Sequence, residues 1–267
     1  MNDRVSITLN DGVADVRMVR IDKMNALDDA MFEALIDAGR QLSATKGLRA
    51  VVLSGEGRGF CAGLDMGNFG KMASGERKGG SGLVDTPRTT SGANRAQNAA
   101  MVWRDLPVPV IAAIHGVALG GGFQLALGAD MRFVTPDARM AILEIKWGLV
   151  PDMSGVALLR SLIRDDLARE LTFTGRIFTG NEAFAMGMAT RVCADPRAEA
   201  LGVAAEIAGK NPDAIRAGKR LLNLAADADQ HAILLAESVE QSALIGTANQ
   251  VEAVMSNMQK RAAVYTD

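Results

Sequence analysis

The chain has 267 residues, a net charge of −2 and 48% hydrophobic residues, which is the composition of an ordinary globular protein. The small net charge gives no electrostatic footprint for nucleic acid or an anionic membrane. With two distant cysteines, Cys61 and Cys193, and no apolar stretch of ~18 residues, we expect a cytoplasmic protein without membrane insertion. Only two histidines occur, which excludes chemistry based on several paired histidines.

The first half of the chain alternates strand and helix patterns. In chain order they predict a hairpin of residues 5–9 and 16–18, a helix over 28–42, a buried strand over 50–53, a helix over 93–104 and a buried strand over 110–114. Residues 67–92 are rich in Gly, Ser, Lys, Arg and Thr and predict a long surface loop, for which a functional role is expected.

A glycine run at 120–122 then opens a predicted helix that continues to about residue 129. Strands are predicted over 131–134 and 139–143. Almost everything after Ser154 has helical periodicity, including one long stretch over 231–261. The chain is therefore predicted to have an α/β body, residues 1–195, and a C-terminal helical region, residues 196–267.

The glycine run Gly120, Gly121 and Gly122 stands between a strand and a helix. The first N–H groups of a helix have no partner within the helix, and the helix dipole makes that end positive. Glycine also allows a ligand to approach the backbone closely. The run is therefore consistent with two interpretations: a site for a substrate oxyanion, or a tight turn between closely packed elements.

A second glycine-rich segment, residues 57–65, follows the strand predicted at 50–53. It formally matches a dinucleotide-binding fingerprint, but a helix should follow and loop composition follows instead. The segment is either a plain loop or a second source of backbone N–H donors.

Two carboxylates, Glu144 and Asp152, are separated by the turn-prone residues Gly148 and Pro151. A chain reversal there would bring both to one pocket, where a pair of carboxylates can act as general base and general acid. The alternative is structural: Glu144 pairs with Lys146 or Arg139, and Asp152 caps the next helix.

Taken together, these features resemble the crotonase, or enoyl-CoA hydratase/isomerase, superfamily. The segments that carry the likeness are 22–27 (DKMNAL), 59–65 (GFCAGLD), 111–122 (IAAIHGVALGGG), 129–132 (ADMR), 148–151 (GLVP) and 174–176 (TGR). Their order and spacing agree with the family from about residue 5 to the C-terminal region, and several independent motifs in the right order make the likeness specific.

The resemblance implies a spiral of ββα units with a C-terminal helical trimerisation region, assembled as a homotrimer or a dimer of trimers. It implies an acyl-CoA thioester as substrate, with coenzyme A as part of the substrate and no metal or other cofactor. By the same likeness the thioester oxygen is held by the N–H groups of Ala62 and Gly121. The positions expected to contact coenzyme A are Lys23, Leu64, Asp65 and, from a neighbouring subunit, Lys260.

The departures from the family pattern concern the proton-transfer residues. Hydratases of the family have two glutamates; one aligns with Glu144, but the other position holds Gln124, which cannot take a proton from water. Dienoyl-CoA isomerases resemble this chain in having carboxylates at the Glu144 and Asp152 positions, although their third carboxylate also falls at Gln124. The likeness therefore favours an isomerase that holds a thioester enolate and moves protons along the acyl chain.

Two other functions remain open. One is an enoyl-CoA hydratase in which Glu144 works nearly alone and Gln124 positions the water. The other is a non-catalytic acyl-CoA-binding scaffold. Dehalogenation and thioester hydrolysis, which the family also performs, are not excluded; an aspartate at the Asp152 position resembles the nucleophile of aromatic-CoA dehalogenases.

Overall fold

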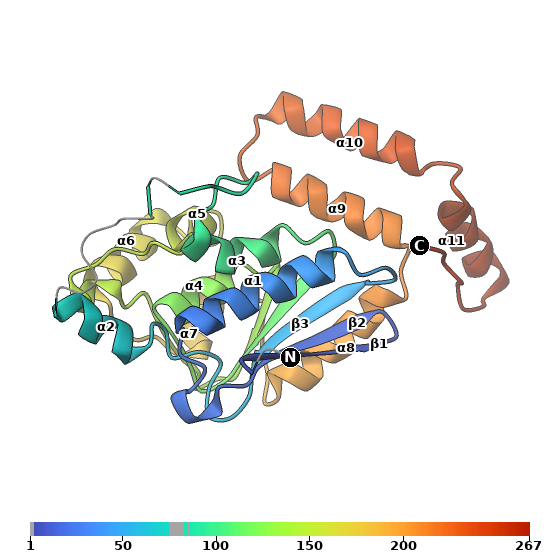
Figure 1. The fold of residues 1–267 in the computed structure, drawn as a ribbon. Coiled ribbons are helices and arrows are strands. Elements are labelled where there is room, and N and C mark those ends of the chain that lie inside the picture. Colours follow the sequence, from blue (N-terminus) through green and yellow to red (C-terminus); the bar gives the residue numbers. More distant parts are fainter. Residues whose placement is uncertain (1–2, 75–82, 85) are drawn as a thin grey trace.

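The computed structural model describes residues 3–74, 83–84 and 86–267. In this described part the main sheet has six strands in the order β1-β2-β3-β4-β6-β8, and a second sheet pairs β5 with β7 (Figure 1). The strands are β1 (Val5–Asn10), β2 (Val13–Met18), β3 (Ala50–Gly55), β4 (Val110–Ile114), β5 (Val117–Leu119), β6 (Met131–Val134), β7 (Arg139–Ala141) and β8 (Arg191–Val192).

The pairing of the strands follows from their connections. A tight turn at Asp11 and Gly12 joins β1 to β2, which pair antiparallel, so the predicted hairpin is confirmed. From β2 to β8 the neighbouring strands of the main sheet are parallel, because the chain leaves the sheet between them. Every residue of β3 and β4 is buried, as expected for parallel strands covered on both faces.

Helices cover both faces of the main sheet. In chain order the helices are α1 (Asp29–Ser43), α2 (Met66–Ala73), α3 (Arg95–Arg104), α4 (Gly121–Leu127), α5 (Gly155–Leu159), α6 (Asp165–Thr174), α7 (Gly180–Ala185), α8 (Pro196–Ala208), α9 (Pro212–Leu224), α10 (Gln230–Leu244) and α11 (Ala248–Gln259). The larger core lies between the sheet and the side of α1, α3 and α4. On the opposite face, Ala200 and Ala204 of α8 pack against β2, β3 and β4.

The chain alternates between the two sheets. β4 of the main sheet is followed by β5 of the small sheet and then by α4; β6 and β7 repeat this order before α5, α6 and α7. This confirms the predicted spiral of ββα units. The strand β5 was not predicted, since His115 and Gly116 break the apolar run before it. The repeat places the loops after β3, β5 and β7 beside one another.

The C-terminal helices α10 and α11 extend away from the sheet (Figure 1). The sequence predicted one long helix over 231–261; this was wrong, because the chain turns at Gly246 (φ +81°) and Thr247 caps a new helix. None of the α10 residues is buried, and Leu234, Leu235 and Val239 are all more than half exposed. Helix α8, which begins just after the boundary predicted at residue 195, packs on the main sheet. The division of the chain into two regions at this residue stays a prediction.

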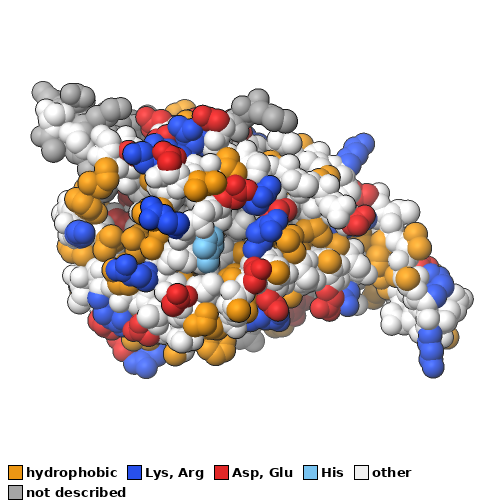
Figure 2. Space-filling model, turned by 90° about the horizontal axis from the view of Figure 1, so that it is seen from below, with side chains coloured by type: hydrophobic (Ala, Val, Ile, Leu, Met, Phe, Trp, Pro, Cys, Tyr) orange, Lys and Arg blue, Asp and Glu red, His pale blue; other side chains and the backbone are white. Residues whose placement is uncertain are grey.

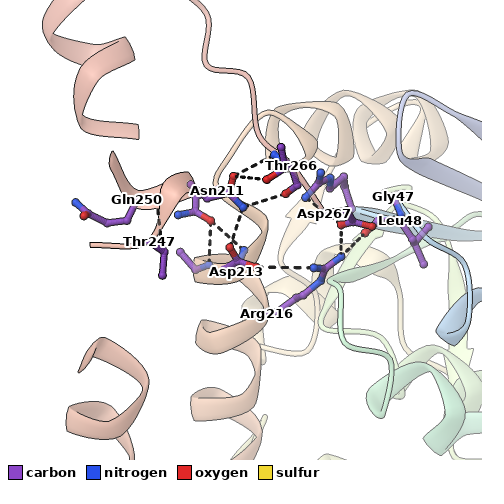
Figure 3. A network of polar contacts seen from close by, with 12 residues as sticks. Gly47, Leu48, Asn211, Asp213, Arg216, Thr247, Gln250, Thr266 and Asp267 are labelled. Carbon is purple, nitrogen blue, oxygen red and sulfur yellow. Dashed lines mark hydrogen bonds and ion pairs between the residues drawn. The ribbon is translucent and has the colours of Figure 1, made fainter. Parts of the chain in front are cut away.

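The end of the chain is tied back to the body by polar contacts (Figure 3). The side chain of Asp267 accepts hydrogen bonds from Arg216 of α9 (2.8 Å) and from the N–H of Gly47, in the loop between α1 and β3. Asn249 of α11 accepts the Thr266 N–H (3.0 Å) and donates to Asp213 of α9 (2.8 Å). These contacts hold α11 at a fixed place beside α9.

The predicted loop over 67–92 is only partly a loop. Residues 66–73 form α2, while residues 75–82 and 85 lie outside the described residues, so the functional role expected of this loop stays a prediction there. Within the described ranges, the helices are too short or too polar to cross a bilayer. The face in Figure 2 has cationic and anionic side chains interspersed with apolar ones, in keeping with the small net charge.

Candidate active site

The segment around Ala62 lies between two neighbouring stretches of backbone. On one side Cys61 pairs with β5, donating to the Val117 carbonyl (2.9 Å) and accepting from the Leu119 N–H (3.1 Å). On the other side the N–H of Ala62 donates to the carbonyl of Met24 (2.9 Å). The N–H predicted to hold the substrate oxygen at Ala62 is therefore already engaged within the protein.

Two residues further on, the pairing changes. The carbonyl of Gly63 accepts the Leu27 N–H (2.8 Å), and the N–H of Asp65 donates to the Leu27 carbonyl (3.0 Å). Because backbone groups alternate in direction along an extended segment, the N–H of Leu64 points away from Leu27. It has no hydrogen-bond acceptor among the described residues.

The glycine run forms the other wall of this gap. Gly120 takes a positive φ of 51°, which turns the chain from β5 into α4, and its N–H donates to Ala141 (2.9 Å). Gly121 then starts α4, and its N–H, like that of Leu64, has no acceptor in the described part of the chain. A Cβ placed on Gly63 would lie 2.5 Å from the Leu119 carbonyl oxygen and 3.8 Å from the Gly121 nitrogen. The two glycine-rich segments are thus in contact, and glycine at 63 is required by space and by its φ of +90°.

Glu144 lies directly beside the glycine run. A Cβ on Gly120 would be 3.3 Å from its Oε1 atom. The residue is buried, and Oε2 has no hydrogen-bond partner among the described residues. Burial raises the pKa of the Glu144 carboxyl, and the charge of Asp152 raises it further. The structural alternative, an ion pair with Lys146, is not observed; that ammonium lies over the Trp147 ring instead.

Gln124 connects Glu144 to the chain that carries Asp152. Its Nε2 donates to Oε1 of Glu144 (2.6 Å), and its Oε1 accepts the N–H groups of Met153 and Gly155, each at 2.9 Å. The side chain is 1% exposed. Asp152 itself is exposed, while Met153 is buried with its sulfur against Gly121. The position of Met153 was not foreseen, since it depends on the left-handed backbone of Ser154 (φ +68°).

The residues expected to bind coenzyme A divide into two groups. Lys23, exposed in the 3-10 turn Ile21–Lys23, lies next to the 62–65 segment through the contact between Met24 and Ala62. Asp65 accepts hydrogen bonds from the Gly67 N–H (2.8 Å) and from Arg20 (2.6 Å), and these lower the pKa of its carboxyl. Lys260 is exposed at the end of α11, at the other end of the molecule from α2 (Figure 1).

A small apolar cavity adjoins Gln124. It is lined mainly by side chains of α4, α5 and the 142–151 loop, among them Leu127, Ile142, Pro151, Val156 and Leu159. Fold and site together define a class: a ββα spiral in which two backbone N–H groups, without acceptors in the described part of the chain, lie near a buried carboxylic acid.

Comparison with known proteins identifies the family. The sequence profile of the Enoyl-CoA hydratase/isomerase family matches residues 8–267. YngF of Bacillus subtilis, named as an enoyl-CoA hydratase/isomerase, is 32% identical over 99% of both chains. The mouse mitochondrial Delta(3,5)-Delta(2,4)-dienoyl-CoA isomerase is also 32% identical, over 93% of this chain and 77% of that one. A structure described as an enoyl-CoA hydratase of Streptomyces coelicolor A3(2) superposes with a TM-score of 0.89 at 30% identity, covering 100% of this chain and 95% of that one. The chain belongs to the enoyl-CoA hydratase/isomerase, or crotonase, family.

Proposed function

We propose that this protein isomerises unsaturated acyl-CoA thioesters, with Glu144 as the base that removes the proton. The observation that supports this most is the environment of Glu144: a buried carboxyl with a raised pKa, one oxygen held and the other unpartnered among the described residues, next to Gly120 at the start of the glycine run. A carboxyl whose pKa lies nearer to neutrality both takes and returns a proton effectively.

The thioester oxygen is held by two backbone N–H groups, those of Gly121 and Leu64. Leu64 replaces Ala62 in this role, because the Ala62 N–H already donates to Met24. Removal of a proton from C2 of a 3-enoyl thioester sends the C–H electron pair into a dienolate, whose negative charge gathers on that oxygen. The two donors stabilise this charge without a cationic side chain.

Return of the proton at C4 completes the migration of the double bond to C2, with no net gain or loss of atoms. In a 3,5-dienoyl thioester the proton returns at C6 instead, farther from Glu144. Asp152 is the second acid, placed close enough to influence the Glu144 pKa.

Hydration is the second candidate, and the names of relatives favour it. Mouse mitochondrial methylglutaconyl-CoA hydratase, for example, is 32% identical over 96% of this chain and 80% of its own. Against hydration, both ends of the Gln124 amide are engaged by Glu144 and by the backbone, and an amide cannot take a proton from water.

The experiment compares 3-enoyl-CoA and crotonyl-CoA as substrates of the wild type, Asp152→Asn and Glu144→Gln. We expect isomerisation of 3-enoyl-CoA to exceed hydration of crotonyl-CoA and to be lost in Glu144→Gln. Robust hydration that survives Asp152→Asn but not Glu144→Gln contradicts the isomerase. Unchanged turnover in both variants would show that neither carboxylate is the base and would overturn the proposal, whereas turnover of neither substrate by the wild type supports the scaffold.

The active unit in this proposal is a homotrimer or a dimer of trimers. The exposed apolar side chains of α10 need a covering surface, and Lys260, distant from the site of its own chain, would reach the coenzyme A phosphates of a neighbour. Sedimentation at micromolar concentration tests this: a monomer with full activity contradicts it. Lys23 and Asp65 would contact the nucleotide part of coenzyme A within one subunit.

A further inference from the structure

The Gln124 amide is held at both ends, so its orientation is determined. Its oxygen accepts two backbone N–H groups, from Met153 and Gly155, and an amide nitrogen could not do so. The nitrogen must therefore face Glu144, to which it donates at 2.6 Å. The contacts are buried, where a hydrogen bond is stronger and a broken one more costly than in water.

We propose that Gln124 is a positioning residue that fixes Glu144 and the Asp152 backbone relative to each other and makes Oε2 the proton-carrying atom of Glu144. The part of this proposal that concerns catalysis rests on the proposed role of Glu144 as the base. Gln124 itself touches neither the thioester nor the reacting carbons in this scheme. It acts through Glu144 and through the backbone next to Asp152.

The choice of oxygen follows from the geometry at Glu144. Oε1 accepts the amide N–H, so a proton placed on Oε1 would have to compete with that donor. Oε2 is buried and without a partner in the described part of the chain, and it remains the atom that takes up the proton. One oxygen thus removes the proton from the substrate and returns it, while the other is anchored.

The second half of the amide acts on Asp152. The two N–H groups bound by Gln124 Oε1 flank Ser154, whose left-handed backbone (φ +68°) is otherwise unfavourable for a residue with a side chain. The hydrogen bonds from these N–H groups to Gln124 stabilise the turn at Ser154, and Asp152 lies just before this turn. The distance between the two acids is therefore set by a single side chain of α4.

Replacing Gln124 with glutamate separates its contact with Glu144 from its contact with the backbone N–H groups of Met153 and Gly155. It keeps the size of the side chain and an oxygen for the Met153 and Gly155 N–H groups. However, it places a second oxygen 2.6 Å from Oε1 of Glu144, where two carboxylates cannot both be ionised without strong repulsion. Among the described residues the charged group that already acts on Glu144 is Asp152, so the added charge reinforces the existing effect.

The experiment measures exchange of the C2 protons of butyryl-CoA with D₂O, as a function of pH, in the wild type, Gln124→Glu and Gln124→Met. This exchange reports enolate formation whether the enzyme isomerises or hydrates. We expect Gln124→Glu to move the pH dependence upward by about one unit or more and to lower the rate about tenfold below that range. Gln124→Met should lose about tenfold to a hundredfold in rate without the upward shift, with little change in KM.

Gln97→Glu is the matched control. It makes the same change of charge on α3, where the Gln97 side chain accepts the Asn94 N–H (2.9 Å) and an N–H of Arg88 (3.4 Å) and forms no hydrogen bond with Glu144 in the described part of the chain. We expect its exchange rate and pH dependence to equal those of the wild type. An equal shift in Gln97→Glu and Gln124→Glu would mean a general effect of charge and would overturn the proposal.

A second readout separates this proposal from the proposed function. The ¹³C NMR titration of the Glu144 carboxyl, assigned by its loss in Glu144→Gln, is recorded on the free protein. If the wild type exchanges no C2 protons, the proposed function fails, while an upward pKa shift of Glu144 in Gln124→Glu still supports the positioning contact. A Glu144 titration and an exchange profile that are the same in all Gln124 variants overturn it.

Discussion

The two walls of the site differ in what they are made of. One consists of backbone: the N–H groups of Leu64 and Gly121, placed where the pairing of the 61–65 segment with β5 ends. The other consists of side chains: Gln124, Glu144 and Asp152. The backbone wall depends on glycine and strand register and hardly on side-chain identity, whereas a single amide-for-acid difference changes the chemistry of the other wall. This is how one fold supports several reactions on a shared enolate.

The side-chain wall gives the largest expected effect. Glu144→Gln keeps the size of the residue but removes the base, so the C2 exchange of butyryl-CoA should fall by ~10²–10⁴-fold. Affinity for the thioester, measured by titration calorimetry, should stay within a few-fold, because the backbone wall is unchanged. Exchange at near the wild-type rate would show that another group removes the proton.

The backbone wall is tested by replacing single N–H groups with ester oxygens, through α-hydroxy acids incorporated at position 64 or 62. Loss of the Leu64 N–H should lower kcat by ~10²–10³-fold. Loss of the Ala62 N–H, which donates to Met24, should lower the unfolding free energy by about 1 kcal/mol and leave kcat nearly unchanged. The reverse pattern would restore Ala62 as the oxyanion donor.

The smallest effect is on stability, where the two walls should respond to pH with opposite sign. Burial raises the folded-state pKa of Glu144, so its contribution to stability is present below the unfolded pKa and is lost as pH rises through the folded value. Glu144→Gln should therefore be as stable as the wild type in acid and more stable at neutral pH and above.

Asp65, on the backbone wall, is the opposite case. The Gly67 N–H and Arg20 lower its folded-state pKa, so its stabilisation is present above the unfolded pKa and is lost as pH falls through the folded value. Asp65→Asn should cost about 1–3 kcal/mol at neutral pH and less in acid. Urea unfolding at several pH values measures both variants; parallel pH curves would contradict this contrast.

Much of the fold could be predicted from the sequence, because local patterns determine it. The hairpin at Asp11 and Gly12, the buried strands β3 and β4 and the helix that starts at the glycine run all follow from periodicity and turn residues. The family likeness supplied the spiral connection between them. The three-residue strand β5 and the break at Gly246 were missed, since both are too short to interrupt the surrounding pattern.

The site was predicted less completely, because its contacts depend on tertiary geometry. Sequence motifs identified the Glu144 position and the glycine run. They did not show that the Ala62 N–H is already engaged, that Gln124 bonds to the backbone at Met153, or that Ser154 adopts a left-handed turn. Each of these requires the register of two segments that are distant in the sequence.

The most direct test follows the atoms during the first turnover of 3-enoyl-CoA in H₂¹⁸O containing D₂O. Mass spectrometry and NMR then locate the label in the product. We expect 2-enoyl-CoA as the first product, with hydrogen returned at C4 and no ¹⁸O incorporated. Recovery of unchanged 3-enoyl-CoA, together with ¹⁸O at C3 of the product formed from crotonyl-CoA in the same solvent, would show that the enolate site serves water addition and would contradict the role assigned to Glu144 and Gln124.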